Sequence, residues 1–338
     1  MADYLKRVYL DAPWFDPDIA SRVALDSRGG IAGFAGVIAQ RMLVDGRPIR
    51  AALTSSLAVD VRAGDPTIAV RLLRDIHAGP QDAVLSDRAN VVSIGLSRAL
   101  KAEPMRDYSL DWLRVIRPAG LAIATAAERF RLARLLAPLV LPFDNASLSR
   151  AQSSEAPRWT APSRTRHADS LIDRDVALDE LLELVPDFLA AFPMRPDWSR
   201  DELTTILTDT AAKAVYGTFV ARLVLTSFGK PLGVFLYHAR RGYVAQVAQI
   251  LALPGREGPV IDRAIAHAAA MGAVAIRGRA QPNLLQALMA RRALFVPDLT
   301  TIVQSRDPDV LHHFHAGTAF FTGLAGENWM RLNGDRFE

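Results

Sequence analysis

The first third of the chain alternates apolar runs with turn-forming residues, a pattern that predicts a meander of strands. Strands are predicted at residues 19–26, 31–44, 49–60, 83–86 and 108–116. Asp45-Gly46 is a strong tight-turn signal between the second and third of these strands. Apolar residues spaced by three and four predict a helix at residues 68–76, and Asn90 can cap a further helix that ends near Leu100.

The second half of the chain repeats this order after two additional predicted helices, at residues 178–192 and 200–210. The elements predicted next are strands at 218–228, 232–238 and 243–253, a loop at 254–258, a helix at 260–271, a strand at 273–277, a helix at 282–292 and a strand at 295–305. The interval between the long strand and the next short strand is similar in both halves. An internal structural repeat explains this similarity.

The repeat divides the chain into an N-terminal domain at residues 1–117, a connecting segment at 118–175 and a C-terminal domain at 176–338. The connecting segment starts with a largely apolar helical pattern and continues with Ser, Arg, Pro and Ala at no clear period, which is typical of an exposed linker. Few residues precede the first strand, and Pro13 and Pro17 lie among them. Because proline breaks helices, the N-terminal domain is predicted to lack leading helices.

Composition places the protein among ordinary globular chains, with 50% apolar and 22% charged residues. The net charge is +4, but no basic block is present, so nucleic-acid binding is not expected. The absence of cysteine removes disulfides, thiolate nucleophiles and zinc fingers, and it suits a reducing compartment. With no signal-peptide pattern and no apolar stretch of about 18 residues, a soluble cytoplasmic protein without a membrane partner is predicted.

The order of a three-strand meander, a loop, a helix, a short parallel strand, a helix and a last strand resembles the GCN5-related N-acetyltransferase (GNAT) superfamily. Segments 31–37, 78–82, 109–113 and 326–329 resemble bacterial tandem GNAT proteins. The resemblance implies an α/β (α+β) fold with two GNAT-like domains, each a mixed, mostly antiparallel sheet flanked by helices. It also implies acetyl-CoA as co-substrate and an amine, on a small molecule or a peptide, as acceptor.

The same resemblance assigns candidate cofactor-binding residues in the N-terminal domain. The edge of the long strand, at Leu57, Ala58 and Val59, should pair with the pantetheine arm. The family's diphosphate-binding loop falls on Gly64, Thr67 and Ala69, followed by Leu72-Leu73, with only a partial match. Arg62 can supply positive charge there, whereas Asp65 opposes an anion. Asn90 is either a cofactor contact or a helix cap, and the equivalent loop of the second half, 254–258, is too short for a second site.

Three carboxylates near the expected cleft are candidates for the base that removes the amine proton: Asp60, Asp87 and Asp111. Turn capping or an ion pair with arginine is the alternative for each. The tyrosine that often protonates the departing thiolate in this family would fall near Ser97, so the general acid stays unassigned. The histidines at 312, 313 and 315 are interpreted as a surface helix end, and no metal is expected.

Two functions remain open at this point. The first is an acyl-CoA-dependent N-acyltransferase, with acetyl transfer to a primary amine. The second is a catalytically inactive tandem that binds a ligand or serves as a scaffold, for example in exopolysaccharide or envelope synthesis. For an active enzyme, the acceptor side of the first sheet would need to be covered by the C-terminal half, the linker or a second subunit of a homodimer, because a site open to water stabilises the transition state less.

Overall fold

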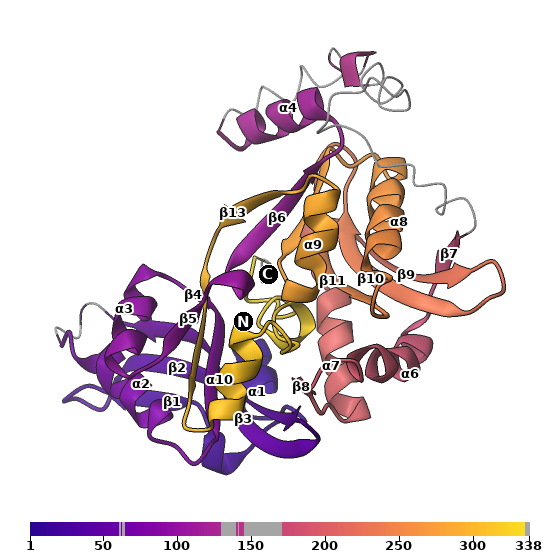
Figure 1. Ribbon diagram of the computed structural model, residues 1–338. Helices are drawn as coiled ribbons and strands as arrows, with labels where there is room; N and C mark the ends of the chain where they lie inside the picture. Colours follow the sequence, from indigo (N-terminus) through magenta and orange to yellow (C-terminus); the bar gives the residue numbers. More distant parts are fainter. Residues whose placement is uncertain (61, 63–64, 130–139, 141, 145–170, 335–338) are drawn as a thin grey trace. The chain divides into compact units, whose positions relative to one another are not determined.

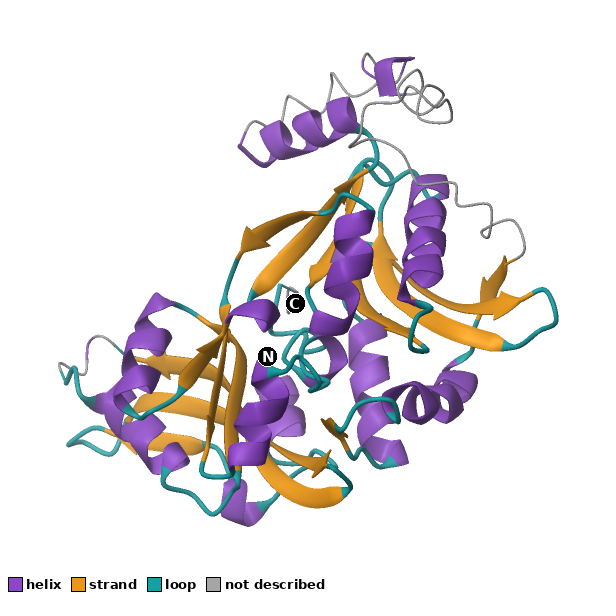
Figure 2. Cartoon of the chain, in the orientation of Figure 1, coloured by secondary structure: helices purple, strands orange, loops and turns teal. Residues whose placement is uncertain are grey.

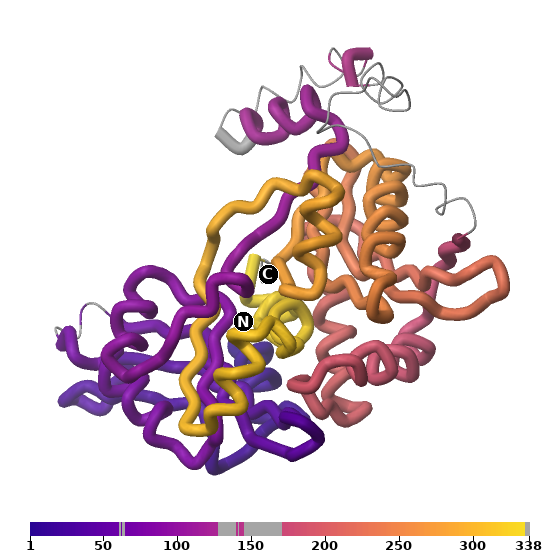
Figure 3. Tube along the Cα trace, viewed as in Figure 1, coloured from indigo at the N-terminus to yellow at the C-terminus, as the bar shows by residue number. Residues whose placement is uncertain are grey.

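The computed structural model describes residues 1–60, 62, 65–129, 140, 142–144 and 171–334. The chain divides into two compact units, and each is built from non-contiguous segments. Unit 1 comprises Met1–Ser109, Phe192–Leu207 and Pro297–Glu338; unit 2 comprises Leu110–Ala191 and Thr208–Val296. The trace in Figure 3 shows the yellow C-terminal segment joining the indigo N-terminal strands of unit 1.

Unit 1 is a mixed sheet with the strand order β1-β2-β3-β4-β14-β5 (Figure 1). β8 pairs with the end of β2, at Met42–Val44. The strands are β1 (Arg22–Leu25), β2 (Ile31–Val44), β3 (Arg47–Val59), β4 (Ala83–Ala89), β5 (Glu103–Met105), β8 (Met194–Pro196) and β14 (Thr300–Ser305). Only the β3–β4 pair is parallel. The helices are α1 (Ala2–Tyr9), α2 (Ile68–His77), α3 (Val91–Ala99) and α10 (Pro308–His315).

The predicted apolar spacing in α2 packs the helix on one face of this sheet. Ile68, Leu72 and Ile76 are buried against small and branched residues of β2, β3 and β4, including Val37 and Val84. A stripe of this kind stabilises an amphipathic helix through burial on the sheet, since each fully buried Leu or Ile contributes about 1.5–3 kcal/mol. The helix therefore begins at a fixed place beside the end of β3.

Unit 2 is a second mixed sheet with the order β13-β6-β12-β11-β10-β9-β7. Its strands are β6 (Leu110–Val115), β7 (Leu171–Asp175), β9 (Thr218–Thr226), β10 (Pro231–Ala239), β11 (Val244–Ala252), β12 (Ala275–Arg279) and β13 (Leu294–Pro297). Its helices are α4 (Pro118–Arg129), α6 (Leu178–Leu189), α8 (Glu257–Ala270) and α9 (Pro282–Ala290), while α7 (Arg200–Ala211) begins in unit 1. Figure 2 shows helices flanking the strands of each sheet. The predicted fold class, two mixed sheets flanked by helices, is confirmed.

Six strands of each sheet follow the same order once one strand of each half is exchanged, whereas the seventh strands differ, since β8 pairs with β2 and β7 pairs with β9. In unit 1, β14 from the end of the chain lies between β4 and β5; in unit 2, β6 from the first half lies between β12 and β13. Each half of the chain therefore supplies an interior strand to the sheet formed mainly by the other half.

The structure differs from the sequence prediction at several elements. The strand predicted at 295–305 is two strands, β13 and β14, which belong to different sheets. The segment predicted as linker ends in a strand, β7, and an eight-residue helix, α1, precedes the first meander, where none was predicted. Residues 145–170, which include the Ser-, Arg- and Pro-rich part of the predicted connecting segment, lie outside the described residues. None of the described helices has the length and apolar character that crossing a lipid bilayer requires.

Candidate functional site

The site begins where the two parallel strands of unit 1 separate. β3 and β4 pair through Ala51–Ala83, Ala52–Val84 and Leu53–Leu85, and the register ends there. The hydroxyl of Thr54 donates to the carbonyl of Leu85 at 3.1 Å. Beyond this point both strands continue, to Val59 and Ala89, without pairing with each other, so the β4-facing edge of β3 lies along an opening. β3 stays paired with β2, and β4 with β14.

A β-bulge shapes the β3 side of this opening. Between the pairs Gly36–Ser55 and Phe34–Ala58, β3 contains one residue more than β2. Ser56 adopts a φ of 52°, which is uncommon for a residue other than glycine. Bulges redirect side chains and backbone groups, and they are frequent next to active sites. The regular ladder between β2 and β3 is therefore interrupted at Ser56 and Leu57.

Tyr9 at the end of α1 holds the bulge. Its hydroxyl lies 2.8 Å from the hydroxyls of both Ser55 and Ser56. Burial raises the pKa of Tyr9 above its ordinary value, outweighing the lowering effect of these two bonds, and the negative charge of Glu327 raises it slightly further. The phenol therefore stays protonated at neutral pH.

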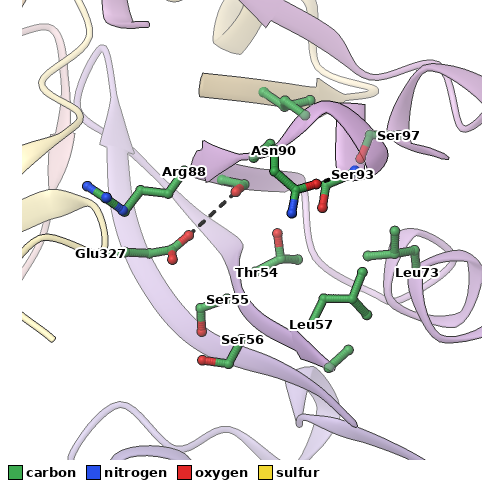
Figure 4. Close-up of a pocket in the computed structure, with 14 residues that line it drawn as sticks. Thr54, Ser55, Ser56, Leu57, Leu73, Arg88, Asn90, Ser93, Ser97 and Glu327 are labelled. Carbon is green, nitrogen blue, oxygen red and sulfur yellow. Dashed lines mark hydrogen bonds between the residues drawn. The ribbon is translucent and has the colours of Figure 1, made fainter. Parts of the chain in front are cut away.

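The opening between β3 and β4 is a pocket of about 130 Å³. Figure 4 shows Ser55, Ser56 and Leu57 on one side and Asn90, Ser93 and Ser97 on the other. The lining residues are Ala35, Thr54, Ser55, Ser56, Leu57, Leu73, Ser86, Arg88, Ala89, Asn90, Ser93, Ser97, Ile302 and Glu327. Two of these, Ile302 and Glu327, come from the end of the chain, which belongs to unit 1.

Glu327 brings a carboxylate to this pocket. Its side chain is buried, and Ser86 of β4 donates to its Oε1 at 3.5 Å (Figure 4). Its backbone N–H donates to the carboxylate of Asp87 at 3.0 Å. Next to it, Arg88 donates to the amide oxygen of Asn328 at 2.9 Å. These contacts fix the tail against β4, so the carboxylate has a defined position.

Comparison with solved structures shows what this geometry resembles. The chain is similar to a GCN5-related N-acetyltransferase from Anabaena variabilis, with a TM-score of 0.54, 12% identity and coverage of 90% of this chain and 69% of that one. It is similar to a conserved protein of unknown function from Enterococcus faecalis described as "Probable N-Acyltransferase", with a TM-score of 0.53, 10% identity and coverage of 84% and 61%. The chain has the GNAT fold.

A third similar structure is a GCN5-related N-acetyltransferase from Kribbella flavida, at a TM-score of 0.49 and 12% identity, of which this chain spans 58%. The chain thus spans only about six tenths of the length of two of these solved structures. No protein-family model matches the sequence. No curated protein matches it either.

Within this GNAT fold, the residues expected to meet the pantetheine arm follow the bulge. Of the three residues expected to meet this arm, Leu57 lines the pocket, whereas Ala58 and Val59 continue β3 beyond it. Asn90, the other candidate cofactor contact, also lines the pocket. The side chain of Asn90 accepts a hydrogen bond from the N–H of Ser93 at 2.9 Å, so Asn90 caps α3 and also lines the pocket. The two roles weighed for Asn90 are compatible.

The residues expected to meet the diphosphate lie around the start of α2. Thr67 directly precedes the helix and Ala69 is its second residue, while Arg62 is exposed and its N–H donates to Asp60. Gly64 lies outside the described residues. The hydroxyl and N–H of Thr67 donate to Asp65 at 2.6 and 2.8 Å; these bonds, with some help from Arg71, lower the pKa of Asp65. A carboxylate therefore already interacts with the donors at this helix start.

None of the three predicted bases lines the pocket. Asp60 is exposed at the end of β3. Asp87 is fully buried and accepts the N–H of Glu327. Asp111 belongs to unit 2, where it forms ion pairs with Arg277 at 2.5 Å and Arg279 at 3.5 Å. Glu327 is not among the bases that the sequence predicts, because no local pattern indicates that segment 326–329 reaches β4.

The corresponding strands of unit 2 are bridged by side chains. β11 and β12 are parallel and pair from Val244–Ala275 to Gln246–Arg277. Further along β11, the buried amide of Gln249 donates to the amide oxygen of Gln281 at 3.1 Å. At the start of α8, the N–H of Gly255 donates to Glu257 at 3.2 Å. In unit 2, a side-chain hydrogen bond thus bridges the strand opening, and a separate hydrogen bond occupies a backbone donor at the helix start.

No group of three His, Asp or Glu side chains within the described part of the chain is arranged to hold a metal ion. The histidines near the end of α10 interact with carboxylates instead. His313 is buried and lies 2.9 Å from Asp45, and His315 lies 3.0 Å from Glu103. The prediction of a surface helix end is therefore wrong for His313, whereas His312 and His315 are exposed.

We expect Gly326→Ala to destabilise unit 1 by about 1–3 kcal/mol, because overpacking forces neighbouring groups to shift. A Cβ at this position would lie 2.0 Å from Oδ2 of Asp87. The matched control is Gly95→Ala in α3, where a Cβ meets nothing within 4 Å. There alanine should raise the free energy of unfolding by about 0.5–1 kcal/mol, because alanine is a better helix former than glycine. Hydrogen exchange of the β4 amides measures both changes. Equal exchange in the two variants would contradict the tight contact.

Proposed function

We propose that unit 1 is an acyl-CoA-dependent N-acyltransferase that transfers an acetyl group to a primary amine. The observation that carries this proposal is the separation of β3 and β4 beyond Leu53–Leu85, with a pocket at the bulge and a carboxylate facing it. The free edge of β3 offers backbone groups to an amide-containing arm, and the fold of the similar N-acetyltransferases supports this use.

In this proposal the amine nitrogen attacks the thioester carbonyl carbon. The carbon–nitrogen bond forms, the carbon–sulfur bond breaks, and CoA leaves as its thiolate. A backbone N–H of the bulge at Ser56 stabilises the developing oxyanion, since pre-oriented donors are the largest source of such stabilisation. Glu327 takes the proton from the amine, directly or through one water. The Ser97 hydroxyl, which also lines the pocket, is placed to hydrogen-bond to the departing sulfur.

The test is calorimetry with acetyl-CoA, for which we expect one site per chain, in unit 1. The start of α2 would bind the diphosphate, so Thr67→Glu should weaken binding about tenfold by adding a negative charge beside it. Asp65→Asn should strengthen binding by about twofold to fivefold, because it removes an opposing charge while leaving an amide in its place. Opposite signs for two neighbouring variants cannot arise from general damage to the fold. Two equal sites, or none, would contradict the proposal.

One observation favours a second candidate, a catalytically inactive protein that binds a ligand or acts as a scaffold. Asp65 interacts with the donors at the start of α2 and with Arg71, at 2.8 Å, where the diphosphate would bind. Absence of acetyl-CoA binding in both the natural chain and Asp65→Asn would support this candidate. For either function we propose a cytoplasmic setting. A homodimer stays a prediction.

A further inference from the structure

Unit 1 contains a second cavity that shares no lining residue with the pocket between β3 and β4. Its volume is about 400 Å³, in the range of small-molecule sites. It lies toward the hairpin end of β2 and β3, where Gln40 is opposite Ala51 and Arg41 is opposite Arg50. The residues of β3 that line the first pocket start at Thr54, farther from the hairpin. The N-terminal loop around Trp14 forms one wall and Ser199 with Glu202 the other.

The cavity opens on a gap in the edge of the sheet. β1 pairs with β2 only as far as Ala35, and β8 pairs with it from Met42 onward. In the gap, the N–H of Val37 donates to the hydroxyl of Ser21 at 3.0 Å, and the carbonyl of Arg41 accepts from Asp197 at 2.9 Å.

Backbone groups of alternate residues face the same edge of a strand. The N–H and C=O of Ala39, midway between Val37 and Arg41, therefore face this gap, and Ala39 lines the cavity. Neither β1 nor β8 pairs with β2 at Ala39. The edge of β2 thus presents to the cavity the N–H donor and C=O acceptor of one residue, which can pair with an extended chain.

Gln40 adds an acceptor that is nearly excluded from solvent. The residue is 7% exposed, lines the cavity, and its Oε1 is buried without a hydrogen-bond partner among the described residues. Buried amide oxygens are nearly always hydrogen-bonded in folded proteins, so one without a partner calls for an explanation. An N–H group of a ligand in the cavity would satisfy it.

Two arginines face each other across the strands at the floor of the cavity. Arg41 and Arg50 are directly opposite in the register, an arrangement that like charges disfavour. Arg41 pairs with Glu202 at 2.9 Å, and Arg50 pairs with Asp16 at 3.4 Å and with Asp18 at 3.5 Å. Two of these carboxylates, those of Glu202 and Asp16, also accept hydrogen bonds from the backbone. Glu202 accepts the N–H of Ser199 in a capping box for α7, and Asp16 accepts the N–H of Asp18.

Each guanidinium carries five N–H donors, so donors remain beyond these ion pairs. A carboxylate between Arg41 and Arg50 would be held by both and would reduce their repulsion. The loop wall adds an apolar surface, with Pro13, Pro17 and Phe15, of which Phe15 is 43% exposed. The lining therefore combines a peptide-like pair, a buried acceptor, two cations and an apolar wall.

We propose that this cavity binds a short extended peptide with a free C-terminal carboxylate. Its backbone would pair with Ala39, one N–H would reach Gln40, the carboxylate would lie between Arg41 and Arg50, and an apolar side chain would contact Phe15. The site is separate from the proposed acyl-transfer pocket, and peptide binding here requires no acyl-CoA.

The test titrates the full chain with N-acetyl-alanyl-leucine as the free acid and, separately, as its C-terminal amide, without acyl-CoA. We expect the acid to bind with a Kd below about 1 mM and the amide about tenfold more weakly, because a charged hydrogen-bonding group is lost. Arg50→Gln should remove most of this preference. Arg71→Gln, an exposed arginine of α2 outside the cavity, should leave both affinities unchanged.

Gln40→Met distinguishes a ligand contact from a structural role. It removes the buried acceptor at similar volume, so we expect the peptide to bind about fivefold to tenfold more weakly while the melting temperature stays equal or rises. No binding of the acid at millimolar concentration, equal binding of acid and amide, or unchanged binding by Gln40→Met would overturn the proposal. The proposal would also be overturned if Arg50→Gln kept the same preference for the acid over the amide as the Arg71→Gln control.

Discussion

A chain that ends at Pro297 should leave unit 1 unfolded while unit 2 stays folded. The truncation keeps β13 but removes β14, which pairs with β4 along Ile302–Ser86, Val303–Leu85 and Gln304–Val84 and with β5 on its other side. An interior strand of the unit 1 sheet is lost, and β4 and β5 no longer have a common partner.

The loss of buried side chains exceeds what unit 1 can tolerate. The removed segment includes six large apolar residues that are almost fully buried: Val303, Val310, Phe314, Phe320, Phe321 and Trp329. At about 1.5–3 kcal/mol for each buried large apolar side chain, their removal matches or exceeds the roughly 5–15 kcal/mol by which a domain is stable. A fragment ending at residue 117 lacks the same segment and should fail to fold for the same reason.

Hydrogen exchange followed by mass spectrometry measures this directly. In the truncated chain, peptides from β2 and β3 should lose protection, while peptides from β10 and β11 keep it and serve as the internal reference. A synthetic peptide of residues 298–338, added in trans, is the control and should restore part of the lost protection. Slow exchange of β2 and β3 in the truncated chain without this peptide would show that β14 is dispensable.

The elements around the pocket between β3 and β4 were largely predictable because their signals are local. The long strands with the turn at Asp45-Gly46, the helix at 68–76 and the cap at Asn90 follow from periodicity and turn chemistry within a few residues. All three agree with β2, β3, α2 and α3 in the structure. The order of these elements was enough to indicate the fold.

The features that the sequence did not predict depend on contacts between distant segments. A period of two shows that residues near 300 form a strand, but it does not show that the strand breaks at Asp298 or that β13 and β14 join different sheets. The bulge residue is serine, so no glycine indicates its positive φ. Glu327 is more than two hundred residues from its partner Ser86 in the chain. Its contribution to the pocket follows only from the folded tail.

Glu327→Gln should lower the rate of acyl transfer about a hundredfold or more, while acetyl-CoA binding stays within about twofold. The substitution keeps the size of the side chain and an oxygen that can accept from Ser86, but an amide does not accept a proton, and general-base catalysis contributes about 10²- to 10⁴-fold. The backbone N–H that bonds to Asp87 is unchanged, so the tail should keep its place.

The matched control is Asp60→Asn, the same change of carboxylate to amide at the exposed end of β3, outside the pocket. It should transfer as fast as the natural chain. The assay follows release of free CoA thiol from acetyl-CoA in the presence of a library of primary amines, and calorimetry follows binding of acetyl-CoA. If Glu327→Gln retains the natural rate and Asp60→Asn loses it, the base is at the end of β3 and Glu327 is a structural residue. Because Asp60 lies at the end of β3 and Glu327 is held against β4, the two variants distinguish a base at the exposed strand end from one fixed by the folded tail.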